Sequence, residues 1–151
     1  MRYQRGFGAI AAIVVLVILA TLAAAIVSLG STQQLTSAQD VMSTKAWQAA
    51  RAGNDWGLYQ ALQIRDWAGA ATTCDTAQRS TTLNLVADTG FNVTVVCDSW
   101  LYNEGESVPG TPKPVRIYQV VAVACPAAAC PAADASSFGY VERTRVVLAT
   151  N

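Results

Sequence analysis

The longest apolar stretch of the chain runs from Phe7 to Leu29 and contains no charged residue and no proline. As a helix, its 23 residues would be roughly 35 Å long, against a membrane hydrocarbon core of about 30 Å. A helix satisfies its own backbone hydrogen bonds in lipid, whereas a lone strand leaves them unpaired. The stretch therefore predicts a membrane-spanning helix that anchors, exports or assembles the rest of the chain.

Basic residues indicate the orientation of this helix. Arg2 and Arg5 precede it, and the next basic residue is Lys45. Because positively charged flanks stay in the cytoplasm, the N-terminus is predicted to be cytoplasmic and the remainder to lie outside. The chain has four cysteines, an even number that fits disulfides in an exported domain.

Composition argues against several classes of function. The formal net charge is zero, and without Arg2 and Arg5 the acidic side chains outnumber the basic ones by two, so no nucleic-acid partner is expected. The chain has no histidine, which removes Ser-His-Asp and Cys-His catalysis and most catalytic zinc sites. Glu104 and Glu106 lie in a Gly/Pro-rich segment and are expected to be solvated. We therefore expect no enzyme activity, no catalytic residue, no metal site and no cofactor.

Three interpretations of the N-terminus remain open. A secretory signal peptide usually has an apolar region of about 7–15 residues before a small-residue cleavage site. Here Ala23–Ala25 lies inside a longer run, which weighs against that interpretation. The second interpretation is a plain membrane anchor. The third depends on a six-residue basic leader that ends in Gly6 and is followed at once by Phe7 and the apolar helix.

That arrangement resembles the class III leader of type IV prepilins and pseudopilins. The resemblance implies that a prepilin peptidase removes residues 1–6 and that the new amine of Phe7 is methylated. It also implies that residues 7–30 form a helix that spans the inner membrane and later lies among other pilin subunits in a filament core.

One position departs from the family pattern. Most prepilins have a glutamate where this chain has Ala11, and that carboxylate offsets the buried N-terminal amine of a neighbouring subunit. An unpaired charge in an apolar bundle costs several kcal/mol. The resemblance with Ala11 therefore implies a minor subunit, for example at a filament tip. The alternative is that Ala11 marks a chain that is not a prepilin.

The helix is predicted to continue far beyond the membrane. From Leu35 to Tyr59 the apolar residues recur in steps of three or four, which indicates one amphipathic helix from about Phe7 to about Trp67. Gly69 is the expected C-terminal stop. Three glycines are expected to weaken the helix, namely Gly30, Gly53 and Gly57.

Two further segments resemble the MshP-type minor pilins of mannose-sensitive haemagglutinin (MSHA) pili. One is AWQAARAGNDWGLYQAL, residues 46–62, and the other is the closing Gly-Tyr-Val-Glu-Arg-x-Arg pattern, residues 139–145. In structural terms, the large side chains of the first segment are predicted to be the core face of the helix: Trp47, Trp56, Tyr59 and Leu62.

The remaining sequence predicts a sheet. Four segments have strand character: Leu83–Ala87, Phe91–Cys97, Val115–Cys125 and Gly139–Thr150. The segment Tyr102–Pro114 reads as a loop because of its Gly and Pro content. The predicted fold is α+β and pilin-like, in which a long N-terminal helix packs on a four-stranded antiparallel sheet within a head of residues 31–151.

The four cysteines admit three disulfide pairings. We favour Cys74–Cys97, which would tie the segment after the helix to the second strand, and Cys125–Cys130, which would close the small loop CPAAAC. Zinc is disfavoured because neither gap has the C-x₂-C spacing.

Together these features predict a minor pilin that acts in assembly or at the tip of a type IV pilus, with cell adhesion as one use of its head. It would reside in the inner membrane, with a periplasmic head, before it joins a surface filament. A minor pseudopilin of type II secretion is the nearest alternative. A membrane-anchored periplasmic binding module that never assembles is an alternative of another class.

Overall fold

The computed structural model describes residues 7–69, 73–133, 135–137 and 139–151, and it divides into two compact units after Asp40. The elements in chain order are α1 (Phe7–Tyr59), the π-helix η1 (Gln60–Ile64), the 3₁₀-helix η2 (Trp67–Gly69), β1 (Arg79–Leu85), α2 (Val86–Thr89), β2 (Phe91–Val108), β3 (Thr111–Cys125) and β4 (Arg143–Thr150).

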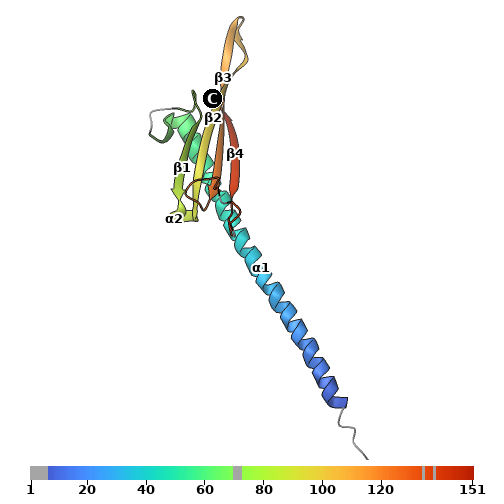
Figure 1. Cartoon of the computed structure of the whole chain (residues 1–151). Coiled ribbons are helices and arrows are strands. Elements are labelled where there is room, and N and C mark those ends of the chain that lie inside the picture. The colour runs from blue at the N-terminus through green and yellow to red at the C-terminus, as the bar shows by residue number, and fades with distance from the viewer. Residues whose placement is uncertain (1–6, 70–72, 134, 138) are drawn as a thin grey trace, which may run out of the picture. The chain divides into compact units, whose positions relative to one another are not determined.

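The four strands form one antiparallel sheet in the order β1-β2-β3-β4, each strand paired with its neighbour in sequence (Figure 1). This confirms the predicted α+β class and the four-stranded antiparallel sheet. The first strand was predicted too late, because β1 already begins at Arg79 and Ala87 belongs to the single turn of α2. Gly90, with φ 85°, ends that turn in the left-handed conformation.

The prediction of a loop over Tyr102–Pro114 was wrong. β2 and β3 continue through this segment as a two-stranded hairpin, which turns between Val108 and Thr111. Its glycines and prolines fit a strand pair here because the pairing is irregular, with register shifts between Asn103 and Val108. Bulges of this kind accommodate residues that a regular ladder excludes.

The helical region also ends earlier than Gly69. α1 passes into η1, and Arg65 then adopts a left-handed conformation with φ 55°. Its backbone N–H donates to the carbonyl of Gln60 at 2.8 Å, which closes the last turn. The stop is set by Arg65, whose side chain pairs with Asp75, rather than by a glycine.

Small residues form the face of α1 that packs on the sheet. Ala46, Ala49 and Ala50 of α1 are buried, as is Ala61 in the η1 turn that follows. A Cβ atom built on Gly53 would lie 2.6 Å from Val93 Cγ1, and one built on Gly57 would lie 2.6 Å from Val120 Cγ1. The buried face therefore consists largely of side chains that are small or absent, and this lets the helix backbone approach the sheet closely.

The long helix is continuous, as predicted, and α1 runs through Gly30, Gly53 and Gly57 without a break. One expectation about its core face was wrong. Trp47 and Tyr59, predicted as core, remain 45% and 53% exposed. Both lie outside the small-residue face.

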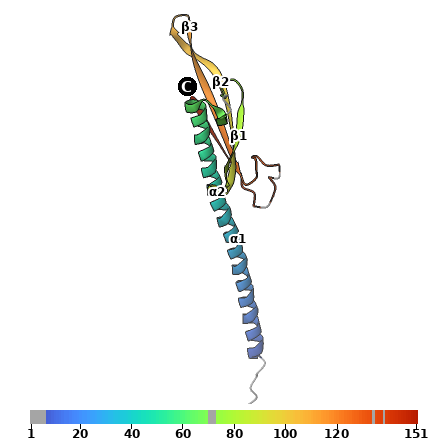
Figure 2. The same ribbon diagram turned by 90° about the vertical axis from the view of Figure 1, so that its left-hand side faces the viewer.

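The sheet has two different faces. Alternate residues of β2 and β3 point toward α1 and form the core together with Trp67; the largest fully buried ones are Phe91, Val93, Val95, Tyr118 and Val120. The loop between β3 and β4 lies on the opposite, outer face (Figure 2). Trp56 fills one end of the core, where its ring meets Trp67 edge-on at a centroid distance of 5.1 Å.

Candidate functional site

The first unit presents a continuous apolar surface. Gly8–Val27 is a helical segment of 20 residues, long and apolar enough to cross a membrane, and every one of its side chains is exposed. The large aliphatic side chains here are 52–72% exposed. Its length and composition fit the membrane span predicted from the sequence.

The hydroxyl within this surface has an internal partner. Thr21 Oγ1 donates to the carbonyl of Ile18 at 2.8 Å, one turn earlier in the same helix. A polar side chain satisfied by its own backbone costs little in an apolar environment. Thr21 is therefore compatible with a lipid-facing or bundle-facing helix.

The predicted processing and assembly residues lie at the start of this segment. Gly6 and the rest of the leader lie outside the described residues. Phe7 is the first residue of α1. The side chains of Phe7 and Leu35 are not among those that the structure describes. Ala11 lies on α1 with its methyl group exposed, so no carboxylate stands at this position of the apolar surface.

In the head, Cys74 and Cys97 are joined, with their sulfur atoms 2.07 Å apart. This is the favoured pairing, and it ties the segment after η2 to β2. Both cysteines are buried. Ser99 reinforces the link, because its Oγ donates to the carbonyl of Cys74 at 2.8 Å.

Next to this disulfide lies a polar cluster that the sequence did not suggest. The Asp75 carboxylate pairs with Arg65 from the end of the helical region and accepts a hydrogen bond of 2.8 Å from Tyr118 Oη of β3. Arg116 Nη1 donates to the Asp75 carbonyl at 2.7 Å and to Ser99 Oγ at 3.2 Å. The cluster joins the helix end, the disulfide segment and two strands.

Tyr118 is fully buried, and this burial raises the pKa of its phenol. The hydrogen bond to the Asp75 carboxylate raises the pKa further, because the bond favours the protonated phenol. The cluster therefore holds Tyr118 as a neutral donor. Its contacts connect the end of the helical region to the sheet.

Cys125 and Cys130 are also joined, at 2.02 Å, again as favoured from the sequence. The loop that they close lies against the outer face of the sheet. Asn92 Nδ2 donates to the carbonyl of Ala127 at 2.8 Å, and the Cys130 N–H donates to Thr94 Oγ1 at 2.9 Å. The peptide bond before Pro131 is cis.

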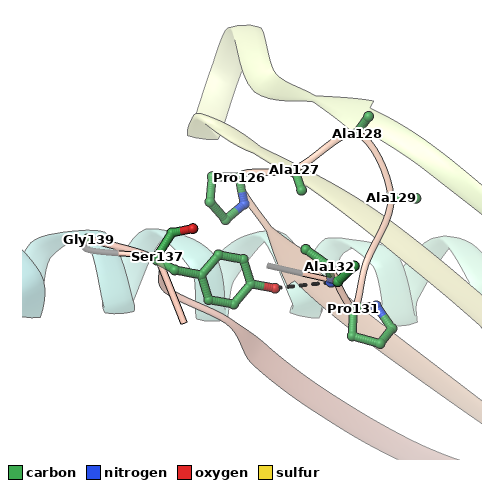
Figure 3. A pocket seen from close by; sticks show the side chains of 10 residues that line it. Pro126, Ala127, Ala128, Ala129, Pro131, Ala132, Ser137 and Gly139 are labelled. Carbon is green, nitrogen blue, oxygen red and sulfur yellow. Dashed lines mark hydrogen bonds between the residues drawn. The ribbon is translucent and has the colours of Figure 1, made fainter. Parts of the chain in front are cut away.

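This loop borders an open hollow of about 610 Å³ (Figure 3). The described lining is uncharged and mostly alanine and proline, with a single phenol from Tyr140. Tyr140 Oη accepts from the Ala132 N–H at 3.3 Å and donates to Glu142 Oε2 at 2.5 Å. Burial, and then the bond to Glu142, raise the pKa of Tyr140. The described lining offers no acid–base pair for catalysis.

Glu104 and Glu106, expected to be solvated in a loop, lie on the exposed hairpin. Glu104 pairs with Lys113 Nζ at 2.9 Å, and Glu106 accepts the Gly110 N–H at 2.9 Å. Both brace the strand pair. At the base of the hairpin Trp100 and Tyr102 are 41% and 52% exposed.

Among the residues that the structure describes, no group of three or more His, Cys, Asp or Glu side chains is arranged to hold a metal ion. Comparison of the chain with protein-family models, curated proteins and solved structures found no match in any of the three.

Proposed function

We propose that this chain is a minor subunit of a type IV pilus, resembling those of MSHA pili, that acts in pilus assembly or at the filament tip. The observation that carries the proposal is the division of α1 into two surfaces. Its inner part, the N-terminal segment Gly8–Val27, exposes large aliphatic side chains. Its outer part, from Val41 to Tyr59, buries small residues against the antiparallel sheet. The role is structural, without enzyme activity.

The apolar inner part supplies the driving force for this role. An exposed helix of this length is unstable in water and requires lipid or other apolar helices around it. In the membrane lipid covers it, and in a filament the equivalent helices of other pilin subunits would do so. Ala11 is the position at which this chain, unlike the major subunits of such filaments, would bring no carboxylate to a neighbour's amine.

The proposal is tested first by the N-terminal mass of the full chain produced together with a prepilin peptidase. We expect a mature chain that begins at Phe7 and carries one methyl group on its amine. Gly6→Ala should leave the leader attached. Gly8→Ala is the matched control and should be processed normally, because a Cβ at Gly8 meets nothing within 4 Å.

Other N-termini would decide between the alternatives. A wild-type chain that still begins at Met1 would contradict the proposal and support a plain anchor. An N-terminus created near Ala23–Ala25 would support a signal peptide. A correctly processed chain that is absent from surface filaments and required for type II secretion would identify the pseudopilin instead.

The tip position has its own test. Labelled wild-type subunit should be rare and terminal on filaments, and Ala11→Glu should increase the amount that enters the shaft. Abundant wild-type subunit along the shaft would contradict the tip position while leaving the pilin assignment intact.

A further inference from the structure

The two edges of the sheet differ in what they expose. The outer-face side chains of β1 are polar: Ser80, Thr82 and Asn84. The corresponding residues near the middle of β4 are Val146 and Leu148, which are 54% and 64% exposed. An antiparallel sheet that packs on one face normally has a polar opposite face, so the apolar edge at β4 is unusual.

The backbone of β4 shows which groups face away from the sheet. Arg116 of β3 and Asn151 exchange both backbone hydrogen bonds, at 3.3 and 3.1 Å. In an antiparallel pair such positions alternate with positions whose N–H and C=O point away from the partner. Since β3 and β4 pair without a register shift, the outward positions are Thr144, Val146, Leu148 and Thr150.

The same four residues therefore present outward backbone groups and the side chains of the outer face. β4 contains neither proline nor a bulge, two of the devices that usually protect an edge strand. On the inner side of the edge, the half-exposed ring of Trp47 lies under the Arg145 guanidinium at 4.4 Å. Apolar surface thus borders the edge on both sides.

Charge restricts what can pair there. β4 carries Arg143 and Arg145 and no carboxylate. Both arginines lie on the inner side, where Arg143 Nε donates to Ser43 Oγ at 3.0 Å and Arg145 covers Trp47. A strand added beside β4 would place alternate side chains next to these cations, and acidic residues would suit those positions.

We propose that β4 is an acceptor edge for an extended segment of another protein, which would add a fifth strand with apolar residues on the outer face and acidic residues on the inner face. Main-chain hydrogen bonds to the four outward positions would provide affinity, and Val146, Leu148 and the two arginines would provide selectivity. This site goes beyond the proposed pilus role and does not depend on leader processing.

The test uses the isotopically labelled full chain in detergent micelles and the capped peptide (Val-Glu)₄, which places valine on one face and glutamate on the other. Nuclear magnetic resonance should show shifted amides at Thr144, Val146, Leu148 and Thr150, and their exchange with solvent should slow at least about tenfold. The amides of β1 are the internal control and should not change. The (Val-Lys)₄ peptide should bind at least about tenfold more weakly.

Two variants separate backbone pairing from side-chain packing. Leu148→Pro removes an outward N–H without removing a bond to β3, and it should weaken binding at least about tenfold. Because proline can disturb the strand, Leu148→Thr serves as a second variant that keeps the amide and removes the apolar contact. It should weaken binding by a smaller factor.

Three results would overturn the proposal. One is unchanged β4 amides at millimolar (Val-Glu)₄, and another is equal protection of β1 and β4. The third is protection of the β4 amides that grows with protein concentration without peptide, because a second copy would then occupy the edge. N-terminal mass spectrometry reports on the pilus proposal separately, so failure of one proposal is distinguishable from failure of the other.

Discussion

The inner and outer parts of α1 belong to the same helix but differ in which side chains they expose and which they bury. From Gly8 to Val27 the helix exposes every large aliphatic side chain it carries, interspersed with alanines, whereas its buried face from Ala46 to Gly57 is largely alanine and glycine. Along this helix the large aliphatic side chains are therefore exposed, and the buried side chains are small. The large aliphatic side chains are available to lipid or to other chains, and the small side chains allow the helix to pack closely on the sheet of its own chain.

This contrast teaches that hydrophobicity alone does not locate the core of a long helix. On the outer part, burial depends on how closely the helix backbone can approach the sheet, and that approach depends on residues without bulk. Four predictions test the contrast, beginning with the largest effect.

The largest loss of stability should follow Gly57→Leu. A Cβ at this position would lie 2.6 Å from Val120 and 2.9 Å from Val95, so a leucine must push the helix off the sheet. We expect about 3 kcal/mol or more of destabilisation of the head in denaturant unfolding. Ala52→Leu, on the exposed side of the same helix, is the control and should change stability by less than about 0.5 kcal/mol. Equal effects at both positions would refute the close packing.

The next effect concerns the inner part. Leu16→Arg places a charge in the middle of the exposed aliphatic surface, where insertion into a membrane should become less favourable by about 3 kcal/mol. Membrane fractionation of the full chain measures this. Gln48→Arg, an exposed change on the outer part, should leave fractionation unchanged. A Leu16→Arg chain that fractionates like wild type would remove the reason to treat the inner part as a membrane span.

A smaller effect is expected for Gly53→Ala. Alanine normally stabilises a helix by about 1 kcal/mol relative to glycine. Here the added methyl group would lie 2.6 Å from Val93 and 3.1 Å from Ala122, so the head should lose about 1–2 kcal/mol in denaturant unfolding. A stabilised Gly53→Ala head would mean that the helix and sheet are further apart than described.

The smallest effect tests how the outer part is held at its end. Tyr118→Phe removes the hydrogen bond to Asp75 and should cost about 1 kcal/mol near neutral pH. Because the pKa of Tyr118 is raised in the folded head, its contribution is complete below pH 10.0, its ordinary pKa, and is lost as the pH rises above that value.

The alkaline fall in stability should therefore be shallower in Tyr118→Phe than in wild type. It should not vanish, since Tyr140 also has a raised pKa. Tyr59→Phe, with an exposed ring, is the control and should leave the unfolding curve near neutral pH unchanged. An identical alkaline slope in wild type and Tyr118→Phe would show that the phenol does not contribute.

The fold class and the Cys125–Cys130 pair could be predicted because both depend on patterns that are local in sequence, and Cys74 and Cys97 are the two cysteines that remain once the small loop is closed. The β-prone runs, the turn before Phe91 and the cysteine spacing each indicate structure within a short window. The hairpin was missed for the same reason, because Gly105 and Gly110 suggest a loop when each is read locally. In the structure their positive φ values, 122° and 85°, serve a bulged strand pair and its turn.

The polar cluster and the acceptor edge could not be predicted from such windows. Asp75 meets Arg65 and Tyr118 only because a helix end, a disulfide segment and a central strand converge. The exposure of Val146 and Leu148 depends on β4 being the last strand, and strand order is a property of the whole head. The small-residue face was visible as composition, but large aromatic side chains gave the stronger signal of a core.

The boundary after Asp40 has a practical consequence. A shortened chain that starts at Val41 would keep the alanines and glycines of α1 that pack on the sheet. It would lack the exposed aliphatic side chains of Gly8–Val27. Such a fragment should dissolve without detergent, which would make the head open to crystallisation and to binding assays in plain buffer.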